Sequence, residues 1–436
     1  MKEERSGVVE PVGESDGKPH LVLMTDGWPY GKGEKPFIEP ELEFLRRRFD
    51  VTVVSTAKDS VAAVEEDMSP VPEGVRLLRV APASKPLVLA GAVSMLLSRA
   101  GRAELRASLV EGQRLKRAYY GLRYWAQARH VARFLKAEGL TEWADAFYGY
   151  WLNYYALAFV MERNRLEKSA GTPLHLCVRT HRYDLYNDRY PSGRQPFHEM
   201  LGEQLDEVVF VSNEGHAYFE NAFMVPDEDG ARLVTSYLGV HPRVEAPELV
   251  TRDAGRPLTI VSCSSVIPLK RVGLIAQGIA ASGIGNYRWV HFGDGPAMSD
   301  VRALVDELGV TCEFKGYCAN DQVLEWLSQG EADVFVTTSS SEGLPVSVQE
   351  AMYFGLPVVA TNVGGMTELL DGNGVLLPAD PAAEQVGEAL ARIDKARQGS
   401  DWLDMARRSR ELWAQHFDSD VNGERFSREL EEAVRQ

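Results

Sequence analysis

Short runs of apolar, β-branched residues alternate with longer helical patterns along most of this sequence. Residues 20–25 (HLVLMT) suit a strand, residues 38–49 (IEPELEFLRRRF) suit a helix, and residues 50–56 (DVTVVST) suit a strand again. Such alternation is typical of βαβ units, in which parallel strands form a sheet between layers of helices. The pattern therefore predicts an α/β fold built from doubly wound parallel sheets.

One interruption of this alternation predicts two domains. Residues 226–256 are rich in proline and charge, and their later part suits an interdomain linker. A second series of strand-like runs begins at residue 258. We expect two Rossmann-like domains that face each other across a cleft. The expected segments are a flexible tail at 1–18, an N-terminal domain at 19–250, a C-terminal domain at 251–417, and a helix at 418–436 that packs back on the N-terminal domain.

Length and composition exclude several classes of protein. The 436 residues suffice for two or three domains with separate cores. A net charge of −16 argues against general nucleic-acid binding. The first 18 residues are polar and do not resemble a signal peptide, so a cytoplasmic location is expected. The cysteines form no CxxC pair, which favours buried, reduced thiols over metal ligands; they are Cys177, Cys263, Cys312 and Cys318.

Nearly every expected strand is followed by glycine, a hydroxyl group, a charge or histidine. Ligands of open α/β sheets bind beyond the carboxyl ends of the strands, so this pattern predicts a polar ligand. A lone histidine is usually a satisfied core residue, but His181 follows a strand and precedes a polar, aromatic stretch, which favours a functional role. Neither residues 31–33 (GKG) nor 293–296 (GDGP) complete a dinucleotide fingerprint, and no P-loop is present.

The basic pair Lys270 and Arg271 ends the loop after the first strand of the second half. A compact ammonium and a planar guanidinium both suit phosphate oxygens. The alternative is a solvated helix start. Basic residues there oppose the helix dipole unless an anion is bound, so phosphate binding is the favoured interpretation.

Two acids, Glu342 and Glu350, flank a Gly-Leu-Pro turn. Pro345 suits a helix start and Gly355 suits a helix stop, so Glu342 should precede the helix and Glu350 should lie inside it. Carboxylates held in this way suit the hydroxyl groups of a ligand with two sugar rings. Backbone N–H groups from Gly343 to Val346 would face the same space and could receive a phosphate.

Residues 257–380 resemble retaining glycosyltransferases of the family-4 type, which have the GT-B fold and a Glu-x7-Glu motif that Glu342 and Glu350 match. The GDGP turn at 293–296 matches the same family. The first half resembles it more loosely, through residues 27–33 and 180–186 (THRYDLY), in a variant similar to bacterial enzymes of surface polysaccharide or lipopolysaccharide synthesis. The resemblance implies transfer of a hexose from a nucleotide-diphospho-sugar, with a UDP-sugar favoured, to a glycan or lipid-linked acceptor. It implies no metal and no cofactor besides the nucleotide-sugar.

The resemblance also implies roles for individual residues. Glu342 would contact the donor sugar, Glu350 the ribose, Lys270 the leaving diphosphate, and His181 the transferred sugar. The family usually has Gly-Arg where this chain has Ser264 and Ser265, so Arg271 is expected to supply the missing cation. Further donor-binding candidates are Gly31, Gly33, Gly293, Asp294, Lys315, Gly316, Gly343, Leu344 and Pro345. Acceptor-binding candidates from the first domain are Trp28, Tyr30, Lys32, Glu34, Tyr150 and Trp151.

Residues 99–136 hold ten Lys or Arg against two Glu, and follow an apolar run at 87–97. This run is shorter than the ~20 residues that a spanning helix needs. The segment suits either an anionic membrane surface, as in a peripheral protein at the inner face of the cell membrane, or a solvated helical face. For the whole chain the alternatives are a GDP-mannose-type donor, a nucleotide-sugar 2-epimerase, a non-catalytic sugar-nucleotide binding module and a membrane-surface scaffold.

Overall fold

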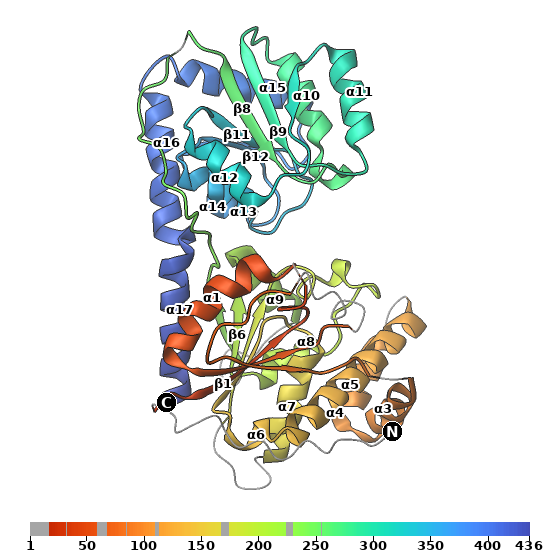
Figure 1. Cartoon of the computed structure of the whole chain (residues 1–436). Helices are drawn as coiled ribbons and strands as arrows, with labels where there is room; N and C mark the ends of the chain where they lie inside the picture. Colours follow the sequence, from red (N-terminus) through yellow and green to blue (C-terminus); the bar gives the residue numbers. More distant parts are fainter. Residues whose placement is uncertain are drawn as a thin grey trace. The chain divides into compact units, whose positions relative to one another are not determined.

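The computed structural model describes residues 17–31, 33–58, 68–83, 85–109, 113–166, 174–223, 230–253 and 255–436. The chain divides into two compact units (Figure 1), one of Met1–Ser236 with Gly423–Gln436 and one of Tyr237–Asn422. The first unit thus ends before the predicted boundary at 250. The reason is that the following residues bond within the second unit, where the Tyr237 hydroxyl donates to Glu368 at 2.6 Å. Most of the expected tail at 1–18 lies outside the described residues.

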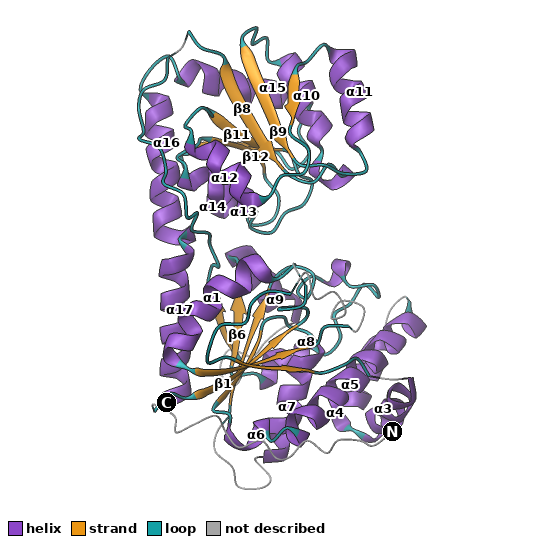
Figure 2. Ribbon diagram, viewed as in Figure 1, coloured by secondary structure: helices purple, strands orange, loops and turns teal. Residues whose placement is uncertain are grey.

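The first unit contains a seven-stranded parallel sheet with the order β3-β2-β1-β4-β5-β6-β7 (Figure 2). Its strands are β1 (His20–Thr25), β2 (Asp50–Ser55), β3 (Arg76–Arg79), β4 (Ala146–Gly149), β5 (His175–Thr180), β6 (Glu207–Phe210) and β7 (Arg232–Thr235). The second unit contains a six-stranded parallel sheet with the order β10-β9-β8-β11-β12-β13. Its strands are β8 (Leu258–Cys263), β9 (Tyr287–Phe292), β10 (Cys312–Phe314), β11 (Val334–Thr337), β12 (Val358–Thr361) and β13 (Gly374–Leu377). The predicted α/β class and parallel sheets are confirmed.

Each central strand is buried on both faces, which explains its nearly continuous apolar sequence. In β1, Leu21 and Leu23 pack in one core cluster, whereas Val22 and Met24 pack in another. In β8, Ile260 and Val261 divide between two clusters in the same way. Successive side chains of a strand point to opposite faces, so each sheet has one core above it and one below it.

Helices connect the strands in both units. Those of the first unit are α1 (Lys35–Arg48), α3 (Lys85–Leu97), α4 (Arg99–Leu109), α5 (Arg114–Ala137), α6 (Leu140–Trp143), α7 (Tyr154–Leu166), α8 (His198–Gln204) and α9 (Asn213–Phe223). Those of the second unit are α10 (Val272–Ala281), α11 (Met298–Leu308), α12 (Asn320–Ser328), α13 (Val346–Tyr353), α14 (Met366–Leu369), α15 (Ala383–Ala396) and α16 (Asp401–Leu412). The last helix is α17 (Ser419–Arg435).

The final residues of α17 belong to the first unit, beside α1 (Figure 1). Arg48 of α1 forms an ion pair with Glu431 at 3.0 Å. Arg179 of β5 is buried, pairs with Glu41 of α1 at 2.7 Å, and lies 4.4 Å from the Phe426 ring. The chain therefore ends on the unit in which it began.

The basic segment predicted at 99–136 forms α4 and most of α5, and the apolar run at 87–97 lies in α3. Both α3 and α4 pack against α5. Within the described part of the chain, no helix combines the length and hydrophobicity needed to cross a bilayer.

The two sheets share one topological feature that positions ligands. Strand order reverses between β1 and β4 in the first unit and between β8 and β11 in the second. Loops on either side of such a switch point diverge to opposite faces of the sheet and leave a crevice, which is where α/β folds bind ligands. That the two domains face each other across a cleft stays a prediction.

Candidate active site

The loops that follow β8 and β11 are bonded together at the switch point of the second sheet. The Thr338 hydroxyl donates to the carbonyl of Arg271 at 2.9 Å, and the Ser340 N–H donates to the carbonyl of Leu269 at 2.8 Å. Because β8 and β11 are parallel neighbours, both loops leave the same edge of the sheet. Sequence segments some seventy residues apart therefore form one surface.

Lys270 and Glu342 meet on this surface. The Lys270 Nζ lies 2.5 Å from the Glu342 Oε1, and both side chains are largely covered. The sequence predicted catalytic roles for each residue separately, and the structure brings the two together. An ammonium and a carboxylate in contact can bind a phosphate oxygen and a sugar hydroxyl side by side.

The hydrogen-bond donors of Arg271 are bonded to the protein itself, whereas a phosphate ligand would need free donors. Its backbone is left-handed, with φ of 47°. Its guanidinium donates to the carbonyls of Thr338, Ser339 and Ala379 at 2.6–3.0 Å, and to Asp380 at 2.8 Å. The predicted role as a leaving-group cation does not fit this geometry, since most of the donors already hold the two loops in place.

Glu350 lies within α13, as predicted. Pro345 directly precedes the helix, and Gly355 follows it with φ of 73°, so both predicted helix signals are confirmed. The Glu350 carboxylate is buried and accepts a hydrogen bond from the Asn320 Nδ2 at 2.8 Å. Burial raises the pKa of Glu350 to about 7, although the Asn320 bond opposes this change. Gly343, Leu344 and Pro345 are half-buried in the turn before the helix.

The glycines after β9 are required by close backbone contacts. A Cβ atom on Gly293 would lie 1.9 Å from the Ser264 carbonyl oxygen, and the Gly293 N–H donates to the Gly316 carbonyl at 2.8 Å. Asp294 is exposed, and Lys315 pairs with Glu313 at 3.2 Å. The GDGP turn thus braces the loop after β8, which carries Lys270.

Two features of this surface were not assigned from the sequence. Asn320 begins α12 and contacts Glu350, which only the folded chain reveals. The Gly364 and Gly365 turn after β12 packs on the motif, because a Cβ on Gly364 would lie 2.0 Å from the Glu342 carbonyl oxygen. The Gly365 N–H donates to the Gly343 carbonyl at 3.1 Å. The sequence NVGG indicates a turn, but it does not show that the turn packs against the residues around Glu342.

In the first unit, Glu34 organises the loop at 26–34. Its carboxylate accepts N–H bonds from Asp26, Gly27 and Trp28 at 2.6–3.0 Å, and a bond from the Trp151 indole. Gly31 closes a turn by donating to the Gly27 carbonyl at 3.0 Å, and Gly33 is exposed. The acceptor role predicted for Glu34 does not fit, because its oxygens hold the loop.

The other predicted acceptor residues differ in accessibility. Trp28 and Tyr150 are 0% and 1% exposed, so neither can line a surface for an acceptor, and those two predictions are wrong. Tyr30 and Trp151 are half-buried and stay candidates. Lys32 lies outside the described residues.

His181 follows β5 and is held from two sides. Its Nε2 lies 3.0 Å from the Tyr150 carbonyl oxygen, and its backbone N–H donates to Asp184 at 2.9 Å. The ring packs 4.4 Å from the Trp151 ring. Burial, assisted by Arg179, lowers the pKa of His181 to about 3, so the imidazole is neutral at physiological pH. A neutral imidazole can exchange hydrogen bonds with a sugar but carries no charge for a phosphate.

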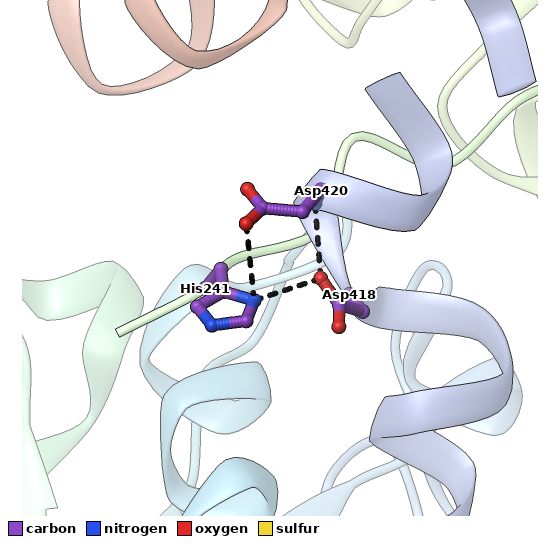
Figure 3. A group of neighbouring side chains, drawn as sticks. All are labelled: His241, Asp418 and Asp420. Carbon is purple, nitrogen blue, oxygen red and sulfur yellow. Dashed lines mark hydrogen bonds and ion pairs between the residues drawn. The ribbon is translucent and has the colours of Figure 1, made fainter. Parts of the chain in front are cut away.

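One group of described side chains has the composition of a metal site (Figure 3). The His241 Nδ1 lies 3.0 Å from Asp418 and 3.6 Å from Asp420. Asp420 also accepts two bonds from Arg243 at 2.9 Å, and Asp418 accepts the Asp420 N–H. Both Asp420 oxygens and the Asp418 Oδ1 are already engaged, so the group is a hydrogen-bonded network around the Arg243–Asp420 ion pair, where the chain enters and leaves the second unit.

Residues 258–394 match the family model described as "Glycosyl transferases group 1". The matched residues include the Lys270–Glu342 pair at the β8–β11 switch point and Glu350 of α13.

The second unit is therefore similar to the group 1 glycosyltransferases.

Two curated relatives are similar to this chain. The amylovoran biosynthesis glycosyltransferase AmsK of Erwinia amylovora is 30% identical over 37% of this chain and 41% of its own length. A GDP-mannose-dependent α-(1-6)-phosphatidylinositol monomannoside mannosyltransferase of Mycobacterium tuberculosis is 26% identical over 57% of this chain and 68% of its own length. For the first of these relatives, therefore, the chain covers less than half of the protein.

Solved structures confirm the fold of this chain. The crystal structure of Anabaena HepE in complex with UDP superimposes with a TM-score of 0.63. It is 16% identical and covers 94% of this chain and 99% of its own. The two Rossmann-like units are therefore those of a GT-B fold.

Proposed function

We propose that this chain moves a hexose from a nucleotide-diphospho-sugar to a glycan or lipid-linked acceptor in the synthesis of a bacterial surface polysaccharide. The observation that carries the proposal is the Lys270–Glu342 pair at the β8–β11 switch point. The chain reaches Glu342 immediately before α13, whose first backbone N–H groups lack helical partners. A cation, a carboxylate and a helix N-terminus together match the parts of a sugar diphosphate.

Each group has one task in this proposal. Lys270 and the N-terminal N–H groups of α13 stabilise the charge that develops on the departing diphosphate. Glu342 accepts hydroxyl groups of the transferred sugar, and Glu350 accepts those of the ribose. Arg271 keeps the loops after β8 and β11 together and acts through their position.

We further propose that transfer retains the anomeric configuration. The acceptor hydroxyl attacks the anomeric carbon from the same face from which the leaving group departs. The departing phosphate accepts the proton of that hydroxyl. Glu342, whose oxygen is paired with Lys270, serves hydroxyl recognition and forms no covalent intermediate. The positive charge for the leaving group comes from Lys270, so the reaction is proposed to need no metal and no further cofactor.

A UDP-sugar is the proposed donor, and a GDP-mannose-type donor is the second candidate. The HepE structure contains UDP, which supports the first. The name of the mycobacterial relative contains GDP-mannose, which supports the second. Incubating the chain with UDP-, GDP- and ADP-sugars while following nucleotide diphosphate release tests both. If no nucleotide-sugar were hydrolysed, transferred or able to raise the melting temperature, the proposed function would be wrong.

We also propose that α3 and α4 contact an anionic membrane surface at its cytoplasmic face. Leu96 and Leu97 are 59% and 76% exposed at the end of α3. Arg102 donates to both of their carbonyls, which places a cation beside exposed apolar side chains. Such a pairing suits the interface of an anionic bilayer. Flotation with anionic vesicles at low salt should carry the wild-type chain and release the Leu96→Ser/Leu97→Ser variant; no wild-type flotation would refute the contact.

A further inference from the structure

A cavity of about 340 Å³ in the first unit lies where β1 and β4 end, at the other switch point. Asp26 and Asn153, from the loops after these two strands, are among the residues that line it. Its walls are mostly aromatic, from Tyr120, Tyr124, Trp151, Tyr154, Tyr183 and Tyr190. Flat aromatic faces suit the apolar face of a sugar ring, whose hydroxyl groups need polar partners at the edge.

Asp26 supplies such a partner. The Asn153 Nδ2 donates to its Oδ1 at 2.7 Å, and the side chain remains exposed to the cavity. Desolvation and the neighbouring Glu34 raise the pKa of Asp26 to about 7. Asp184, also in the lining, is already committed, since it accepts the N–H groups of Leu152 and His181.

The Tyr124 hydroxyl is a second polar group without a structural role. It is buried and has no hydrogen-bond partner among the described residues, and Tyr124 is one of the residues that line the cavity. A buried hydroxyl without a partner costs about 1–3 kcal/mol, so a ligand that supplies the partner would gain that energy.

Two cations, Lys58 and Arg123, complete the lining. Both are exposed, and neither forms an ion pair with another described residue. The Arg123 guanidinium lies 5.7 Å from the Tyr119 ring, which holds it beside the cavity. The cavity lining therefore combines a carboxylate, several aromatic rings and two exposed cations.

A row of side chains on α5 leads away from the cavity. Leu115, Tyr119, Arg123 and Gln127 are spaced four residues apart, so they form one row on the helix. Gln127 and Arg123 line the cavity, whereas Leu115 at the far end of the row is 87% exposed. The row thus passes from the sugar-sized cavity, through a cation, to an exposed apolar side chain.

We propose that this cavity binds the acceptor, and that the acceptor is a sugar carrying an anionic group, phosphate or carboxylate. The ring stacks on the tyrosines, Asp26 and the Tyr124 hydroxyl bond its hydroxyl groups, and Arg123 with Lys58 holds the anion. The inference rests on the proposed glycosyltransferase function and names its acceptor class. Asp26, Tyr124 and Arg123 replace Trp28, Tyr150 and Glu34 as acceptor-binding residues.

Saturation-transfer NMR on the full chain, with glucose, glucose 1-phosphate and glucuronic acid as probes, tests the proposal. The acidic sugars should bind about tenfold more tightly than glucose, as one charged hydrogen bond predicts. Arg123→Gln should abolish this preference and leave glucose binding unchanged, whereas Asp26→Asn should weaken all three. Lys116→Gln is the matched control, since it removes an exposed α5 cation outside the cavity lining.

Equal binding of neutral and acidic sugars, or equal effects of Arg123→Gln and Lys116→Gln, would overturn the proposal. A fourth probe, a polyprenyl phosphate glucose in phosphatidylcholine vesicles, identifies the source of the anion. If the chain binds the polyprenyl phosphate glucose but not glucose 1-phosphate, the acceptor is lipid-linked. If it binds glucose 1-phosphate, the acceptor is soluble. Nucleotide-sugar affinity should be the same in all variants. If the wild-type chain bound no nucleotide-sugar, the proposed function would be refuted. The binding of neutral and acidic sugars would still test whether the cavity is a sugar site.

Discussion

The two motif glutamates have different partners, and the partners decide their chemistry. Glu342 contacts a cation, Lys270, whereas Glu350 is buried against a neutral amide, Asn320. An amide offsets only part of the cost of burying a carboxylate. Burial raises the pKa of Glu350 to about 7, so its charge changes near neutral pH.

This difference predicts a pH dependence of nucleotide binding. In the proposed function, a ribose hydroxyl donates to the ionised form of Glu350, whose pKa burial raises to about 7. Since a raised pKa keeps the carboxyl protonated below that value, affinity should be highest above pH 7 and fall as the pH decreases through it. Calorimetric titration of the nucleotide diphosphate between pH 6 and 8 measures the effect. Glu350→Gln should bind about tenfold more weakly at pH 8 and keep only the pH dependence that the diphosphate itself causes, because the new amide does not titrate. An unchanged slope in that variant would exclude Glu350 as the cause.

The sequence predicted some residues well and others poorly, for physical reasons. The positions of Glu342 and Glu350 about a helix start followed from local signals, Pro345 and Gly355, which act within one turn. The engagement of Arg271 by three carbonyls and the burial of Trp28 depend on segments distant in sequence. Contacts of that kind leave no local pattern. The predicted contribution of Gly31 and Gly33 to donor binding stays a prediction.

At the scale of elements, the active surface is a set of loops that brace one another. The loop after β8 is bonded to the loop after β11, the GDGP turn supports the first, and the Gly364 turn supports the second. Backbone-to-backbone contacts of this kind leave no room for a Cβ. The alternation of strands and helices predicted where the loops fall, but not which loops touch, since that follows from strand order.

Gly293→Ala should therefore destabilise the chain. The new methyl group would meet the Ser264 carbonyl at 1.9 Å, and φ of 133° is unfavourable for alanine. We expect a loss of about 2–4 kcal/mol in unfolding free energy, from strain and overpacking together. Chemical denaturation measures it. Gly285→Ala is the control, because no atom lies within 4 Å of its added Cβ and its φ is not positive. Equal stability of the two variants would contradict the bracing role.

At the scale of the whole molecule, each unit has its own sheet with a core on either face, and α17 returns the chain end to the first unit. The buried Arg179 connects α1, β4 and α17, through Glu41, Tyr148 and the Phe426 ring. The sequence predicted the terminal helix from its pattern, whereas the buried arginine beneath it could not be foreseen.

Phe426→Ala should unfold the first unit more easily. The ring is 3% exposed and packs 5.3 Å from the Tyr148 ring, so its removal leaves a cavity and uncovers Arg179. Losses for such substitutions are about 3–5 kcal/mol. Val421→Ala, on the same helix but 47% exposed, should change the unfolding free energy little. If the two variants had the same unfolding free energy, α17 would not contribute to the core of the first unit.

The turnover of Lys270→Ala tests the central claim most directly. If the Lys270–Glu342 surface stabilises a departing nucleotide diphosphate, the variant should lose ~10²–10³ in kcat with a proven donor. Its melting temperature should stay close to that of wild type, and nucleotide diphosphate release by Lys395→Ala, a control at an exposed lysine of α15, should stay within a few-fold of wild type. Near-normal kcat in a folded Lys270→Ala chain would contradict the account.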